Sequence, residues 1–429
     1  MNIIKRVFGY RIRNKWIVTL AAITVQVAIG ALYAWSLFNE PISEAFGVDK
    51  DTVVTTYSIS LVSFALSTML SGRIQLRLGP RYTTLIGALL YTSGIFLSSF
   101  ATSPGMLYLT YGVMAGAGVG FVYVCPLSTL VKWFPSKKGL VTGLATGSFA
   151  IGGFVFKTVI GNMFNIGDAA YTTELVSSVF LTLAGVYAVM TIGGALLLDV
   201  PEGEVKVKKK AAAQNWDHKT KEMLKTSNFY KLLFSDFFAL MPGLLVIGLA
   251  KDIGTDFVGL SYEKAAGVVA FIAIFNAAGR LASGFLADKL GALNVYRTMY
   301  LVTIVSLAIL AFIPLSYPFF LLTILGITLG YGAFLSLVPT IVGRLFGGKF
   351  FSANYSFIFQ AYGVAALLGP IIKRFSTSYN QTFMIAMGTA VVGLFVAMMI
   401  KDIEEEVVEE QLPVNKKLQP SFIPAKQQG

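Results

Sequence analysis

The stretch FNAAGRLASGFLADKLG, residues 275–291, places an arginine, Arg280, in a segment made mostly of alanine, glycine and large apolar residues. The apolar run begins near residue 264, so it has about the 20 residues that a helix needs to cross a bilayer. Runs of this length recur along the whole chain. Because a backbone in the hydrocarbon must satisfy its own hydrogen bonds, we predict an all-α membrane protein.

Twelve spanning helices are predicted in this way. They cover residues 16–39, 52–72, 82–101, 106–131, 139–162, 174–198, 229–251, 264–287, 295–315, 318–343, 350–372 and 379–400. The composition agrees, because 55% of the residues are hydrophobic and 13% are charged, against about 25% charged in soluble proteins. The first run is too long for a signal peptide and lacks a cleavage site, so it is expected to be retained.

The distribution of charge predicts the orientation in the membrane. The net charge is +12, and most of the basic residues fall in loops on the side of both termini. The opposite loops carry acids such as Glu40, Glu44 and Asp49. By the positive-inside rule, the N- and C-termini are expected in the cytoplasm of a multi-pass cell-membrane protein. The basic excess therefore predicts a topology and no nucleic-acid partner.

The chain contains one cysteine, Cys125, and one histidine, His218. An intramolecular disulfide and a histidine-based metal site are therefore excluded, and no cofactor is expected. The sequence also shows no paired catalytic acids and no nucleophile next to a base, so an enzyme is not expected.

The two halves of the chain repeat each other at an offset of 212 residues, which places Gly72 on Gly284 and Gly79 on Gly291. The same offset relates Gly118 to Gly330, Gly120 to Gly332 and Lys132 to Arg344. Parallel six-helix repeats with a ligand site between them are typical of one large class of transporters. We expect an N-terminal six-helix bundle (1–198), a cytoplasmic linker (199–228), a C-terminal six-helix bundle (229–401) and a cytoplasmic tail (402–429).

The segment GFLADKLG, residues 284–291, resembles the loop motif G-x-x-x-D-R/K-x-G of the major facilitator superfamily. The resemblance implies two pseudo-symmetric six-helix bundles, with Asp288 and Lys289 as gating residues. Asp288 is expected to pair with a base across the bundle. The first-half copy, residues 72–81, has Leu76 in place of the acid, so the latch is expected to be stronger in the second half.

A finer resemblance is to the oxalate/formate antiporter and monocarboxylate transporter group. It rests on YAWSLF (33–38), GAGVGFVY (116–123), KWFPSKKGLVTG (132–143) and NAAGR (276–280). Within that group the arginine at the position of Arg280 anchors the substrate carboxylate. The chain departs from animal-type members, which have an acid at Asn276 and a lysine at Leu37. It also departs from oxalate carriers, which have a second base in the span predicted at 350–372.

The residues themselves leave two interpretations of Arg280 open. A charge near the bilayer centre costs about 2.5–3.5 kcal/mol, so it should face a cavity or a partner. The alternative is a helix-end residue whose side chain snorkels to the inner surface. Asn276, Arg280 and Gly284 lie on one helix face, which favours a site. The planar guanidinium also suits a carboxylate better than a lysine would.

Other candidates have equally simple structural alternatives. Tyr331 lies between two glycines and is a candidate site residue or a packing ring, and so are Tyr33, Tyr123 and Phe359. Lys157 either snorkels to the outer surface, pairs with an acid such as Glu40, or attracts anions. Asp256 and Glu263 are candidate protonation sites or solvated surface acids, and Asp236 is a structural partner for a base or a proton carrier.

Taken with the resemblance, the sequence predicts a secondary active transporter of small monocarboxylate anions such as lactate or pyruvate. Proton symport by alternating access is favoured, because a lone anion would move charge against an inside-negative potential. The expected setting is the lipid bilayer of a bacterial inner membrane, with the monomer as the functional unit. The alternatives are an oxalate/formate-type anion antiporter, a non-transporting receptor on the same fold, and a membrane enzyme.

Overall fold

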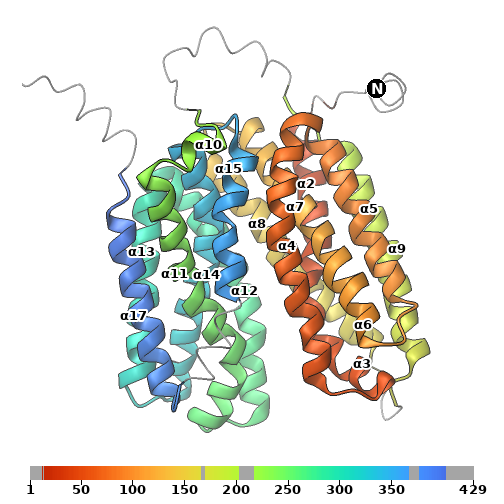
Figure 1. Cartoon of the computed structure of the whole chain (residues 1–429). Coiled ribbons are helices and arrows are strands. Elements are labelled where there is room, and N and C mark those ends of the chain that lie inside the picture. The colour runs from red at the N-terminus through yellow and green to blue at the C-terminus, as the bar shows by residue number, and fades with distance from the viewer. Residues whose placement is uncertain (1–11, 13, 166–169, 202–216, 367–375, 402–429) are drawn as a thin grey trace, which may run out of the picture.

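The computed structural model describes residues 12, 14–165, 170–201, 217–366 and 376–401. Every element in these ranges is a helix. Figure 1 shows two helix bundles side by side, with both ends of the described chain at the same face of the molecule. We call this the linker face, because the chain passes from the first bundle to the second there, and the other end is the opposite face.

The first bundle is built from the N-terminal half of the chain. Its helices are α2 (Lys15–Gly30), extended by the 3₁₀ segment η1 (Ala31–Leu37), then α4 (Lys50–Leu78), α5 (Pro80–Ser98), α7 (Gly116–Trp133), α8 (Lys138–Met163) and α9 (Thr173–Leu197). Three shorter elements lie between these helices. They are α3 (Asn39–Phe46) before α4, and α6 (Pro104–Leu107) and the π-helical segment η2 (Tyr108–Ala115) before α7.

The second bundle repeats this order. Its helices are α11 (Ser227–Asp252), which runs into the π-helical segment η4 (Ile253–Phe257), then α12 (Tyr262–Leu290), α13 (Ala292–Phe312), α14 (Tyr317–Leu345), α15 (Phe351–Ile358) with the helical residues 360–366, and α17 (Tyr379–Met398). The short helix α10 (Thr220–Met223) lies at the linker face (Figure 1).

A helix occupies each of the twelve predicted spans, so the predicted fold of two six-helix bundles is confirmed. Nine helices in the described ranges are long and apolar enough to cross a membrane. Of the other three spans, α5 carries more polar residues, α12 includes residues whose side chains lie outside the description, and the span predicted at 350–372 runs past residue 366 into residues outside the description. Several helices are longer than predicted, because their polar last turns continue past the apolar core.

The repeat of the sequence is also a repeat of backbone geometry. Gly79, between α4 and α5, has a φ of 83°, and Gly291, between α12 and α13, has a φ of 84°. These positive angles favour glycine, and the two residues are 212 positions apart. Pro80 then opens α5 at a position where its missing N–H costs nothing. The same turn therefore reverses the chain at the linker face once in each bundle.

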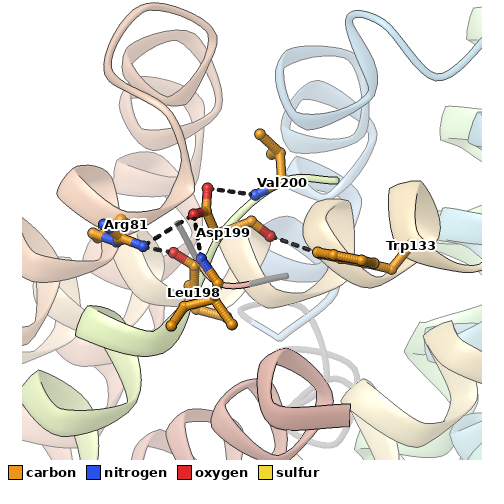
Figure 2. A network of polar contacts seen from close by, with 6 residues as sticks. Arg81, Trp133, Leu198, Asp199 and Val200 are labelled. Atoms are coloured by element: carbon orange, nitrogen blue, oxygen red, sulfur yellow. Dashed lines mark hydrogen bonds and ion pairs between the residues drawn. The ribbon is translucent and has the colours of Figure 1, made fainter. Parts of the chain in front are cut away.

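A buried polar network holds the linker-face end of the first bundle together (Figure 2). Arg81, which is 7% exposed, donates from Nη2 to Asp199 Oδ2 at 3.1 Å and from Nε to the Leu198 carbonyl at 3.2 Å. Trp133 Nε1 donates to the Asp199 carbonyl at 2.7 Å. The network ties α5 and α7 to the residues that follow α9, where the chain leaves the bundle.

We expect Asp199→Ala to destabilise the protein strongly, because it removes a carboxylate that pairs with the buried Arg81 charge. Removing one partner of a buried pair costs about 3–5 kcal/mol. The matched control is Glu40→Ala, which breaks the exposed Lys50–Glu40 pair at a cost of about 0–1 kcal/mol. Denaturant unfolding of the purified protein in detergent measures both, and equal losses in the two variants would contradict this account of the network.

Candidate functional site

A cavity of about 440 Å³ lies between the two bundles, in the half of the molecule toward the opposite face. Both bundles line it. The lining residues are Tyr33, Trp35, Ser36, Asn39, Val54, Tyr57, Leu61, Ala150, Gly153, Phe154 and Lys157 from the first bundle, and Leu244, Ile247, Gly248, Ile272, Ala273, Asn276, Tyr331, Tyr362 and Ala366 from the second. The wall is mainly apolar and aromatic, with few polar groups, which is typical of a site for a small molecule.

Arg280 lies on α12 one turn from Asn276, on the side toward the linker face, and its side chain is 1% exposed. Nε donates to Asn276 Oδ1 at 2.8 Å, and Nη1 donates to the Thr146 carbonyl of α8 at 2.7 Å. The third nitrogen, Nη2, is buried without a hydrogen-bond partner among the described residues. The snorkelling alternative is therefore wrong, and the guanidinium keeps one free donor group in the interior.

Asn276 and Tyr331 both line the cavity, and they come from neighbouring helices of the second bundle. The backbones of α12 and α14 approach closely at Gly332, where an added Cβ would lie 2.3 Å from the Asn276 carbonyl oxygen. Gly243 of α11 gives Tyr331 its space in the same way, because a Cβ there would lie 2.6 Å from the ring. Close contacts at these glycines thus fix the positions of the Asn276 amide and the Tyr331 phenol in the cavity wall.

Small residues also bring the two bundles together beside Arg280. An added Cβ at Gly284 of α12 would lie 2.3 Å from the Gly139 carbonyl oxygen of α8, and one at Gly143 would lie 2.5 Å from the Arg280 carbonyl oxygen. No side chain fits at such distances. The backbone contact between α8 and α12 explains how the Arg280 side chain reaches a main-chain carbonyl of the other bundle.

Asp288 makes the predicted contact across the bundles, but its partner is different from the one expected. Its two carboxylate oxygens accept from the backbone N–H groups of Gly139 and Leu140, each at 2.8 Å. These are unpaired donors of the first turn of α8, and a helix N-terminus attracts negative charge. Among the described residues, the carboxylate thus caps a helix rather than binding a base.

Lys289 takes no part in this contact. Its ammonium lies 4.4 Å from the ring centroid of Phe285 on the same helix, and the side chain is exposed. Its assignment as a gating residue remains a prediction that the geometry does not favour.

The three remaining aromatic candidates separate into two groups. Tyr33 lines the cavity, and its hydroxyl lies 3.3 Å from the hydroxyl of Tyr362. Tyr123 and Phe359 are buried and do not line it. Their ring centroids are 5.0 Å apart, and both pack on Phe64 at 5.2 Å. We call these three rings the aromatic cluster; it joins the two bundles at one contact.

The charged candidates near the opposite face also differ in position. Lys157 lines the cavity, whereas Glu40, its expected partner, pairs with Lys50 at 2.8 Å. The alternative in which Lys157 pairs with Glu40 is therefore wrong, because α3 places Glu40 beside Lys50 at the start of α4. Asp256 is exposed and accepts from Thr255 and Tyr379, outside the cavity wall. The side chain of Glu263 lies outside the described residues.

Sequence reasoning missed several residues of the cavity wall. Trp35 Nε1 and Asn39 Oδ1 are buried without a hydrogen-bond partner among the described residues, and Tyr57 and Tyr362 also line the cavity. With 34 phenylalanines and 19 tyrosines in the chain, aromatic residues alone carry little signal. The motif YAWSLF (33–38) contains Trp35, but nothing in it marks the 3₁₀ segment that turns this side chain toward the cavity.

Two six-helix bundles that meet at the linker face and leave a central cavity toward the opposite face are the architecture of a class of secondary transporters. The comparisons agree. A family profile described as Major Facilitator Superfamily matches residues 16–370 and 232–426. The chain belongs to the Major Facilitator Superfamily, and it is a multi-pass membrane transporter.

Among its relatives, an uncharacterised transporter of this superfamily from Escherichia coli, YhjX, is 29% identical over 83% of this chain and 86% of its own. The oxalate:formate antiporter of Oxalobacter formigenes is 27% identical over 90% of this chain and 91% of its own. Monocarboxylate transporter 12 of Xenopus laevis is 25% identical over 83% and 81% of the two chains. The resemblance inferred from the motifs is thereby confirmed.

The fold is similar to that of solved transporters. The proton:xylose symporter XylE superposes with a TM-score of 0.73 at 14% identity, over 90% of this chain and 96% of its own. This likeness concerns the fold alone.

We expect Gly284→Ala to weaken closure of the linker face, because its Cβ would collide with the Gly139 carbonyl and separate α8 from α12. Spin labels at the exposed positions Leu78 and Leu290 should then show a longer distance distribution by pulsed electron resonance. Gly388→Ala is the matched control, since nothing lies within 4 Å of its added Cβ. Unchanged distances in Gly284→Ala would refute the role of this contact.

Proposed function

We propose that the protein is a symporter of small monocarboxylates, such as L-lactate or pyruvate, and protons. The observation that carries the proposal is the buried guanidinium of Arg280, whose Nη2 has no partner among the described residues and which lies one helical turn from Asn276 in the cavity wall. A charged donor that is buried and unpaired is costly, and a carboxylate would satisfy it.

The surroundings of Arg280 fit a small hydroxy or keto acid. Among the described residues, Asn276 uses its carbonyl oxygen to accept from Arg280, so its amide N–H groups remain for a substrate oxygen. Tyr331 supplies a hydroxyl from α14. The apolar side chains Leu244, Ile247 and Ile272 of the cavity wall would pack against a short aliphatic group.

Proton symport follows from electrostatic energy. Moving one negative charge inward against an inside-negative potential of 100 mV costs about 2.3 kcal/mol. A proton carried with each monocarboxylate removes that cost. With the linker face in the cytoplasm, as the basic loops indicate, the cavity opens to the outside. We place the protein in a bacterial inner membrane, with the monomer as the working unit because the cavity is formed within one chain.

An anion antiporter of the oxalate/formate kind is the second candidate. Lys157 lines the same cavity as Asn276 and Tyr331, so a second cation is available for a dianion. The relationship to the oxalate:formate antiporter, at 27% identity, favours the same alternative. Such an exchanger would need no proton site.

We expect Arg280→Lys to reduce uptake of radiolabelled L-lactate into proteoliposomes about tenfold or more. A lysine cannot form two parallel hydrogen bonds with a carboxylate, and the loss of one charge-assisted bond costs about 1.5–3 kcal/mol. Wild-type uptake should rise with an inward proton gradient. Arg297→Lys is the matched control, because Arg297 binds the carbonyls of Ala397 and Ile400 away from the cavity.

Preloaded vesicles separate the two candidates. Lactate uptake driven by the proton gradient alone supports the symporter. Uptake of oxalate that requires internal formate, and that falls in Lys157→Gln, would favour the antiporter. Full lactate uptake by Arg280→Lys would show that Arg280 is not the carboxylate anchor.

A further inference from the structure

A second buried ionisable group lies in the second bundle, away from the cavity wall. Asp236 of α11 is 3% exposed, and its Oδ1 atom is buried without a hydrogen-bond partner among the described residues. The neighbouring Ser235 is fully satisfied, because its hydroxyl contacts Tyr296, Tyr300 and the Gly393 carbonyl. An acid in the interior of a membrane protein is expensive to keep unless it has a function.

Four tyrosines lie within electrostatic range of this acid. Tyr296 and Tyr300 of α13 feel its charge, and so do Tyr355 of α15 and Tyr123 of the first bundle. No lysine or arginine of the described residues forms a salt bridge with it. An ionised carboxylate here has no directly bonded cation among the described residues, and a bound proton would neutralise it.

The other helices packed on α11 bring few charges. The ionisable groups of α14 are Tyr317 at its start, Tyr331 at the cavity and Arg344, which donates to the Ala287 carbonyl. On α17, Tyr379 lies at the opposite face and donates to Asp256. On α12, Arg280 is the interior cation.

Two tyrosines interact electrostatically with both Asp236 and Arg280 of the proposed carboxylate site. Tyr123 and Tyr355 interact with each other and are close enough to both Arg280 and Asp236 to feel the two charges. Asp236 is nine residues from the start of α11 at the linker face, which is about 13 Å along the helix axis. Arg280 is ten residues from the end of α12 at the same face, or about 15 Å, so the two charged groups lie at nearly the same depth in the second bundle.

We propose that Asp236 carries the proton that accompanies each monocarboxylate. The inference rests on the proposed function and supplies its missing proton site. In the empty transporter, the positive charge of Arg280 and the negative charge of Asp236 balance in the interior. When a substrate carboxylate binds Arg280, the interior gains one negative charge, and Asp236 binds one proton to restore the balance.

The proton has a path in each direction. Tyrosine hydroxyls both donate and accept hydrogen bonds, so the interacting pair Tyr123 and Tyr355 can pass a proton toward Asp236. When the aromatic cluster separates and the linker face opens, water reaches Asp236 from that side. The carboxyl O–H bond then breaks, the proton leaves with the substrate anion, and the transporter returns with Arg280 and Asp236 balanced.

Proton uptake on substrate binding tests the assignment. L-Lactate is added to purified protein in weakly buffered detergent solution with a pH-indicator dye. Wild type should take up about one proton for each lactate bound, and Asp236→Asn should bind lactate with no proton uptake. Asp252→Asn, the same change at an exposed position of the same helix, should behave as wild type. In vesicles, Asp236→Asn should keep lactate exchange and lose acceleration by a proton gradient.

A second measurement covers the case in which Asp236→Asn does not fold. Infrared difference spectra on lactate binding should show a new band of a protonated carboxyl group in wild type, and this band should shift in Asp236→Glu. An unshifted band, or undiminished proton uptake in Asp236→Asn, overturns the assignment. Wild-type lactate exchange without any proton uptake overturns it too, while leaving the carboxylate site intact. Absence of lactate exchange in wild type refutes the proposed function, and the proton assignment with it.

Discussion

The structure depends on keeping one guanidinium in the interior of a membrane protein. Arg280 satisfies two of its nitrogens with Asn276 on its own helix and with a main-chain carbonyl of the other bundle. The second bond requires α8 and α12 to touch at backbone distance, which glycines at 139, 143 and 284 permit. The candidate site and the contact between the bundles therefore use the same segments of α8 and α12, so a change in one alters the other.

Closure of the linker face uses the chemistry of helix ends. Asp288 caps the N-terminus of α8 from the other bundle and satisfies two N–H groups that no residue of α8 can bond. The contact is strong because it joins a carboxylate to a helix dipole, and it is reversible because water can replace it. On the other seam, Ser352 Oγ of α15 donates to the Gly72 carbonyl of α4 at 3.0 Å, a bond between neutral groups.

The fold could be predicted from the sequence because apolar runs of spanning length and a constant offset of 212 residues are local or periodic signals. Asn276, Arg280 and Tyr331 could be predicted because helical spacing and flanking glycines mark them. Contacts between residues far apart in the chain could not be predicted. The Arg81–Asp199 pair, for example, joins residues 118 positions apart, and no sequence pattern marks it. The predicted partner of Asp288 was wrong for a related reason. Its partners are backbone N–H groups at a helix N-terminus, and no residue type identifies such groups in a sequence.

The difference between the halves has a structural explanation. With Leu76 where the first-half motif would have its acid, α4 has no carboxylate to cap a helix of the other bundle. Its loop arginine, Arg81, instead binds Asp199 within the first bundle. The first-half loop thus fixes the end of its own bundle, and the second-half loop holds the two bundles together. Among the described residues, a carboxylate joins the bundles at the α8–α12 contact and neutral groups join them at the α4–α15 contact, so the duplicated loops divide rigidity and gating between them.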